Sequence, residues 1–182
     1  GAYHVEIMLD GEFAEKYRIP DADKTVDFQI TPYHVDVQWA SETSFVYNGS
    51  EQYPQASVAA LAGDSITIGF SGTGINVGNY TVEATSLNPN YRLDNRTQPY
   101  SITARPIMVE EWSNNRSLQY NGGKQNVTVT HVDNAVSDAE LKQILDSLTY
   151  SIVGHEAVNV GFYSITAVLP TNSNYYISDG AT

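Results

Sequence analysis

Apolar and polar residues alternate along three stretches of the chain, each of which contains a glycine at or near its start. These stretches are residues 1–6, 77–84 and 160–167. In each, a tyrosine lies two positions after the glycine, and Val or Ile lies two positions after the tyrosine. Alternation with period two is typical of a strand with one buried face. The pattern therefore predicts three similar strands, with Tyr3, Tyr80 and Tyr163 facing inward.

A second pattern recurs between these strands. Trp39 and Trp112 are 112 − 39 = 73 positions apart, and Tyr47 and Tyr120 are 120 − 47 = 73 positions apart. Each of the two tyrosines precedes Asn-Gly, which favours a tight turn because both turn residues adopt positive φ. Trp39 shares strand parity with Val37, so we expect it to pack in a core. The equal spacing predicts a tandem repeat.

The repeat divides the chain into three parts. Residues 1–31 resemble the closing strands of an incomplete upstream repeat. Residues 32–105 form a complete repeat, and residues 106–182 form a second repeat without its closing strand. This pattern indicates that the chain is a fragment of a longer protein. An open sheet edge is a template for another strand. We expect the leading hairpin to fill the open edge of a second unit on another molecule, giving a strand-exchanged homo-oligomer.

The second repeat also contains a short helix, at about residues 137–147. Ser137 and Glu140 have the spacing of a capping box, in which each side chain binds the other's backbone N–H. Leu141, Ile144 and Leu145 then fall on one helical face. Because insertions in repeats often carry binding, this helix is a candidate ligand surface that we expect to be removable without loss of folding.

Charge and composition exclude several classes of function. The net charge is −12, with nine Lys and Arg residues against 21 Asp and Glu, so the chain would repel a nucleic-acid backbone. It contains no cysteine, which rules out disulfides and Cys-based zinc sites. No apolar run approaches the roughly 18 residues that a membrane helix needs. We therefore predict neither nucleic-acid binding nor membrane insertion.

Trp112 and Tyr176 are the candidate ligand-binding residues. Glu110 and Glu111 interrupt the alternation before Trp112, which indicates a β-bulge and a more exposed indole than that of Trp39. Tyr175 and Tyr176 point to opposite faces of a strand, so one of the two is expected to be exposed. Exposed aromatic rings are platforms for glycans and protein partners.

No catalytic, metal-binding or cofactor-binding residues are predicted. Glu110 and Glu111 are adjacent on a strand and face opposite ways, so they cannot flank one glycosidic bond. The histidines, at positions His4, His34, His131 and His155, lack the spacing of metal ligands. Asp21, Asp23 and Asp27 lack the glycine and glutamate of an EF-hand loop and resemble a solvated turn. We expect the chain not to be an enzyme.

The order of these motifs resembles the MBG/YDG family of bacterial surface repeats. The matching segments of the first repeat are Pro32 to Trp39, Tyr47 to Gly49, Val77 to Val82, Asn90 to Leu93 and Ile102 to Pro106. In the second repeat they are Tyr120 to Gly122, Val160 to Ile165 and Asn174 to Ile177. The resemblance covers nearly the whole chain, although Asn replaces the more usual Asp in both turns and the helix has no counterpart in the family pattern.

The resemblance implies an extracellular, all-β module arrayed in tandem in large bacterial surface proteins and adhesins. It leaves both Ig-like and β-grasp-like units open. The resulting interpretation is a non-catalytic spacer or stalk whose partners are neighbouring repeats of the same chain. Two alternatives remain: a domain that binds a host glycan or protein through the helix and the Trp112 region, and an accessory module of an extracellular enzyme.

Overall fold

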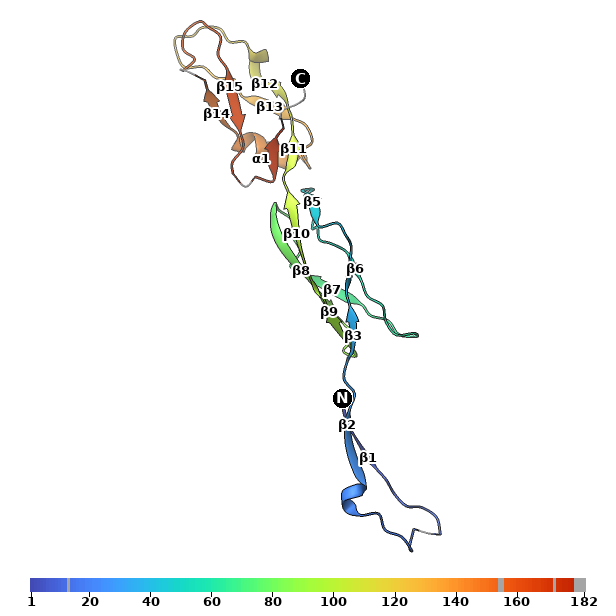
Figure 1. Ribbon diagram of the computed structural model, residues 1–182. Helices are drawn as coiled ribbons and strands as arrows, with labels where there is room; N and C mark the ends of the chain where they lie inside the picture. The colour runs from blue at the N-terminus through green and yellow to red at the C-terminus, as the bar shows by residue number, and fades with distance from the viewer. Residues whose placement is uncertain (13, 154–155, 172, 179–182) are drawn as a thin grey trace. The chain divides into compact units, whose positions relative to one another are not determined.

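Strands form most of the regular structure of the chain, as Figure 1 shows. The computed structural model describes residues 1–12, 14–153, 156–171 and 173–178. Within these ranges one α-helix occurs, so the prediction of an all-β fold with one short helix is confirmed. The division into repeat units stays a prediction.

The strands and helices are short. In chain order they are β1 (Ala2–Glu6), η1 (Asp21–Asp23), β2 (Thr25–Gln29), β3 (Tyr33–Asp36), β4 (Gln38–Trp39), β5 (Ser44–Val46), β6 (Ala56–Ser57), β7 (Ile68–Ser71), β8 (Gly78–Ser86), β9 (Tyr91–Asp94), β10 (Thr97–Thr103), β11 (Arg105–Ile107), β12 (Val109–Trp112), η2 (Ser113–Arg116), β13 (Val129–Val132), α1 (Asp138–Ser147), β14 (Thr149–Ile152), β15 (Ile165–Val168) and β16 (Tyr175–Ile177). The two η elements are 3₁₀ helices.

The chain forms two compact units. The first comprises Gly1–Gln38, Ser57–Gly69 and Ala84–Arg96, and the second comprises Trp39–Ala56, Phe70–Glu83 and Thr97–Thr182. The predicted boundary between residues 105 and 106 falls inside the second unit.

In the first unit, β1 and β2 form an antiparallel hairpin. Tyr3 pairs with Phe28, and their rings stack with centroids 5.4 Å apart. Every residue of both strands is exposed, so the expected inward position of Tyr3 is wrong. The alternation that predicted a buried face is present, but in this chain no second layer covers it within the described residues.

The first unit also contains the parallel pair β3 and β9. Its buried side chains are Val35, Tyr91 and Leu93, which follow the period-two alternation of the two strands. Tyr91 is buried with its hydroxyl accepting a hydrogen bond from the backbone N–H of Leu61 at 3.2 Å. This pairing satisfies a polar group that burial would otherwise leave without a partner.

The second unit holds the main hydrophobic core. Its four-stranded sheet has the order β5-β10-β8-β7, in which β10 runs parallel to β5 and antiparallel to β8. β11 pairs in parallel with β16, while β12 with β13 and β14 with β15 form antiparallel pairs. The buried members of the core are Tyr47, Val82, Tyr100, Ile102, Ile107, Val129, Val132, Ile144, Leu148 and Tyr175.

Both tryptophans pack against this core. Trp39 contacts the ring of Phe70 and Trp112 contacts the ring of Tyr150, with centroids 6.1 and 6.4 Å apart. The expected core position of Trp39 is confirmed, since it is partly buried beside the core. The pairing of β12 with β13 shifts register between Val109 and Trp112, as the predicted bulge requires.

The predicted helix is present as α1, and it belongs to the core. The Ser137 side chain accepts a hydrogen bond from the backbone N–H of Glu140 at 3.3 Å, which caps the first turn. Ile144 is buried, and Leu141 and Leu145 pack against the core. Removing residues 137–147 would therefore open the core, contrary to the expectation that this helix is dispensable for folding.

Candidate functional site: a tyrosine–glutamate cluster and an open pocket

A glutamate and two tyrosines meet beside the first turn of α1. The hydroxyl of Tyr47 donates to Glu140, whose two carboxylate oxygens lie 3.0 Å away, and the hydroxyl of Tyr175 donates to Oε2 at 2.6 Å. The two rings meet edge to face with centroids 5.4 Å apart. We call these three residues the Glu140 cluster. It joins the predicted first repeat, which contains Tyr47, to the predicted second repeat.

Each member of the cluster is placed by its local sequence. Tyr47 directly follows β5, and Gly49 turns the chain after it with φ of +77°. Glu140 occupies the first turn of α1, so the helix fixes the direction of its carboxylate. The carboxylate thus binds two tyrosines instead of closing the capping box, so only half of the predicted capping box forms.

A second set of hydrogen bonds lies next to the cluster. The side chain of Asn174 accepts from the backbone N–H of Val77 at 2.9 Å and donates to Oδ1 of Asn76 at 2.9 Å. Arg105 donates through Nε to the backbone oxygen of Asn134 at 2.8 Å. These contacts tie residues 76–77 and Arg105 of the predicted first repeat to the predicted second repeat.

The environment of the cluster opposes ionisation of its tyrosines. Burial, and then the hydrogen bond to Glu140, raise the pKa of Tyr175 from the ordinary value of 10.0 to about 12. The same causes raise the pKa of Tyr47. Because the folded pKa exceeds the unfolded pKa, the neutral hydroxyls stabilise the fold fully below pH 10, and this contribution is lost as pH rises toward 12.

We therefore expect the free energy of unfolding to fall between about pH 10 and 12. Tyr175→Phe should flatten this fall, although the variant starts about 1 kcal/mol less stable at neutral pH because it lacks the hydrogen bond. Urea unfolding at a series of pH values, with tyrosinate absorbance as the titration readout, measures both effects. An equally steep fall in the variant would contradict the assignment to Tyr175.

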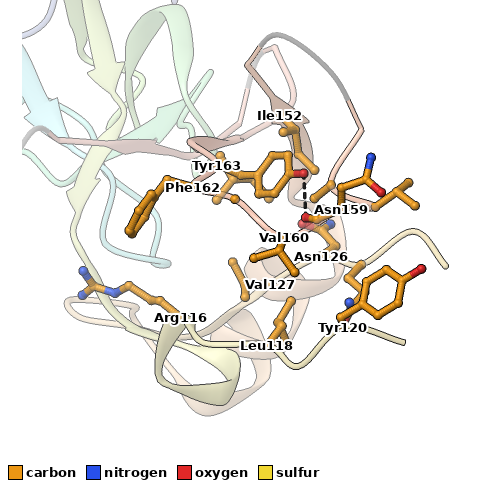
Figure 2. A pocket seen from close by; sticks show the side chains of 15 residues that line it. Arg116, Leu118, Tyr120, Asn126, Val127, Ile152, Asn159, Val160, Phe162 and Tyr163 are labelled. Carbon is orange, nitrogen blue, oxygen red and sulfur yellow. Dashed lines mark hydrogen bonds between the residues drawn. The ribbon is translucent and has the colours of Figure 1, made fainter. Parts of the chain in front are cut away.

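A pocket opens at another part of the second unit, as Figure 2 shows. Its volume is about 270 Å³. Its lining includes Leu118, Tyr120, Ile152, Val160, Phe162 and Tyr163. Tyr163 donates from its hydroxyl to the backbone oxygen of Asn159 at 2.8 Å, the bond drawn dashed in Figure 2. Val160 is 91% exposed although it is apolar, so this surface is open to solvent.

The structure does not place the two predicted ligand-binding residues in this pocket. Trp112 is partly buried against Tyr150 and ends β12, while Tyr176 is exposed in the middle of β16. Tyr175 is buried and Tyr176 exposed, so the expectation that one of the pair is exposed is confirmed. A ligand role for Trp112 and Tyr176 stays a prediction.

Sequence reasoning missed both the cluster and the pocket. The sequence predicts only a helix-cap role for Glu140, because its partners lie 93 and 35 positions away, beyond any local pattern. Among the described residues, no group of three or more His, Asp or Glu side chains could hold a metal ion. His155, one of the four histidines, lies outside the described residues.

Comparisons with known proteins leave the family open. In the described part of the chain, no helix has the length and apolarity needed to cross a membrane. No protein-family model, curated protein or solved structure matches the chain. The resemblance to MBG/YDG repeats therefore rests on the sequence motifs alone.

Proposed function

We propose that this chain is a non-catalytic structural repeat module of a large bacterial cell-surface protein, in which it acts as a spacer. The observation that carries this proposal is the direct, linker-free joint between the two predicted repeats. β10 ends at Thr103 and β11 begins at Arg105, so a single residue separates the last strand within the first predicted repeat from the strand that crosses into the second.

Recurring contacts support the repeat on which the proposal depends. The hydroxyl of Tyr80 donates to the backbone oxygen of Asn76 at 2.8 Å, and that of Tyr163 donates to the backbone oxygen of Asn159 at the same distance. Both tyrosines lie two positions after a glycine, in the motif that the sequence repeats. Equivalent residues thus make equivalent bonds 83 positions apart.

A second recurrence involves the buried tyrosines of β9 and β16. The Tyr91 hydroxyl accepts from the backbone N–H of Leu61 at 3.2 Å, and the Tyr175 hydroxyl accepts from that of Val136 at 3.1 Å. Each tyrosine follows an asparagine in the sequence. The two loops that meet these hydroxyls differ in length, since the second carries α1, yet the bond is retained.

The joint itself resists bending because several side chains cross it. The Glu140 cluster, the Asn174 hydrogen bonds and the short β10–β11 connection fix it at three separate places. Neighbouring domains joined by flexible linkers move independently, whereas a packed and hydrogen-bonded contact holds one angle. A fixed angle between successive modules is what a spacer requires.

The joint can be tested with Gly49→Ala. A Cβ at Gly49 would lie 2.8 Å from Cγ1 of Val136, across the joint. We expect the clash to displace Val136 and change the angle between the two halves of the second unit, which stay in contact. Residual dipolar couplings should report one alignment tensor for residues 39–104 and 105–178 of the wild type, leaving out the first-unit segments, and two different tensors for Gly49→Ala.

Gly122→Ala is the matched control. Gly122 ends the corresponding Asn-Gly turn with φ of +78°, against +77° at Gly49, but the nearest atom to its Cβ position is the Tyr120 hydroxyl at 4.0 Å. Both variants carry the strain of positive φ, and only Gly49→Ala adds the clash, which we expect to cost about 1 kcal/mol more. Two tensors in the wild type would contradict the spacer.

The surface location requires a separate test. The net charge of −12 suits a solvated, extended surface protein, and the motif resemblance points to the bacterial exterior. We expect an export signal and further copies of the Gly-x-Tyr motif in the gene's full reading frame. A reading frame without an export signal would refute the location while leaving the spacer geometry intact.

A further inference from the structure

The pocket of Figure 2 is lined in part by two segments of the second unit. Residues 117–120 and 161–164 both contribute to its lining, and neither segment belongs to a strand, although the structure describes both. The matching segments of the first repeat are residues 44–47, which contain β5, and residues 78–81, which begin β8. The same sequence motif is therefore a strand in one place and not in the other.

In the first repeat, β10 lies between these two segments. β10 pairs in parallel with β5 through Ile102 and Phe45, and antiparallel with β8 through Tyr100 and Tyr80. The rings of Tyr80 and Tyr100 stack with centroids 5.4 Å apart and planes 22° apart. The pocket thus occupies the position that β10 fills in the first repeat.

β2 has the pairing geometry of β10. Tyr3 and Phe28 are cross-strand partners, as Tyr80 and Tyr100 are, and their rings stack with centroids 5.4 Å apart and planes 21° apart. The residue two positions after Phe28 is Ile30, as Ile102 follows Tyr100. Among the described residues, however, β2 pairs with one strand, namely β1.

We propose that the pocket is a vacant strand site that binds residues 25–31 of a second copy of this chain. β2 would exchange β1 for residues 161–165 and gain residues 117–119 on its other edge. This inference rests on the repeat correspondence, but not on the spacer role or the cell-surface location.

The exchange conserves the antiparallel pairing. Residues 161–165 read Gly-x-Tyr-x-Ile, and residues 1–5 read Gly-x-Tyr-x-Val. Tyr163 would replace Tyr3 opposite Phe28. Ser164 would replace His4, whose Nδ1 lies 3.0 Å from the Asp27 carboxylate, and its hydroxyl can also donate to that carboxylate. Strand exchange between copies costs little when the new pairing reproduces the old one.

The exchange also buries apolar surface that the hairpin leaves exposed. Phe28 is 45% exposed and Ile30 58% exposed, whereas their counterparts Tyr100 and Ile102 are 4% and 2% exposed. Leu118 and Val160, in the pocket wall, would be covered at the same time. Since burial of apolar surface drives association, the second copy supplies a gain that the separate chains lack.

The test uses two complementary variants. Ile30→Asp disables the donor strand, and Leu118→Asp disables the pocket, because a carboxylate facing apolar side chains should raise the dissociation constant by about 100-fold or more. Both side chains are exposed in the separate chain, so the substitutions leave its fold intact. Ile7→Asp, in the hairpin connection, and Leu61→Asp, outside the pocket, are the exposed controls.

Sedimentation velocity over a concentration series should show association of the wild type and both controls, and monomers for each variant alone. An equal mixture of Ile30→Asp and Leu118→Asp should form dimers, because one chain retains the pocket and the other the strand. A monomeric wild type at all concentrations, or association that survives either variant, would overturn the proposal.

A peptide of residues 97–106, the segment that contains β10, provides a second readout. It should compete with association of the wild type and bind the Ile30→Asp chain, but not the Leu118→Asp chain, in fluorescence anisotropy. Binding of the peptide to a wild type that never associates would overturn the second copy as the occupant. Neither outcome depends on whether the Gly49→Ala test supports the rigid joint.

Discussion

Gly72→Ala should destabilise the second unit by about 4 kcal/mol or more, a size that indicates a specific steric conflict. Gly72 follows β7 with φ of +77°, and a Cβ built there lies 2.2 Å from the backbone oxygen of Thr81 in β8. A backbone oxygen within a paired strand cannot move aside as a flexible side chain can. The variant must therefore separate the end of β7 from β8 or distort both.

Gly122→Ala separates this clash from the backbone strain. The φ of Gly122 is +78°, nearly that of Gly72, and its Cβ position is uncrowded. The free energy of unfolding of Gly122→Ala should therefore fall by only about 1–2 kcal/mol, the cost of a left-handed φ for an L-residue. Equilibrium urea unfolding of the two variants measures the difference. Equal losses would show that the approach of Gly72 to Thr81 contributes nothing to stability.

Ile107→Ala should cost about 3–4 kcal/mol, because the side chain is fully buried and its removal leaves a cavity. Ile107 ends β11, the strand that follows the joint, and it pairs with Ile177 of β16. Its backbone oxygen also accepts a hydrogen bond from the N–H of Ser178 at 2.9 Å. Equilibrium urea unfolding should measure this loss. At alkaline pH it should add to the fall in the free energy of unfolding that ionisation of the tyrosines causes.

Ile75→Ala is the control for this cavity. It removes the same atoms from a side chain that is about half exposed, so the expected loss is below about 1 kcal/mol. A loss at Ile107 as small as that at Ile75 would show that the core relaxes around the missing atoms and that the two predicted repeats do not share a continuous core.

The local elements of this fold follow from the sequence. The alternation around Val82, the Ser137 helix cap and the bulge before Trp112 are all set by residues within a few positions. The period-two pattern identifies the buried face of β8 because the rest of the unit covers it. Around Tyr3 the same pattern meets no such cover, since alternation describes a strand and does not supply its partner.

The contacts that matter most for the proposed function were not predictable in this way. Tyr47 and Glu140 are 93 positions apart, and neither the Asn-Gly turn nor the helix cap indicates that they meet. Residues 117–120 and 161–164 line the pocket and form no strand, although their sequence counterparts at 44–47 and 78–81 contain β5 and the start of β8, so their own sequence does not predict the pocket. Local patterns fix elements, whereas joints and vacant sites depend on tertiary pairing.

The parallel pairing of β11 with β16 has a mechanical consequence. If the chain is pulled between residues 104 and 178, the force enters at the start of β11 and leaves at the end of β16, which are opposite ends of a parallel pair. All hydrogen bonds of the pair are then loaded together. The hairpin of β1 and β2 is antiparallel, so pulling between Gly1 and Ile30 loads its bonds one after another. Under tension the hairpin should therefore open long before the β11–β16 pair.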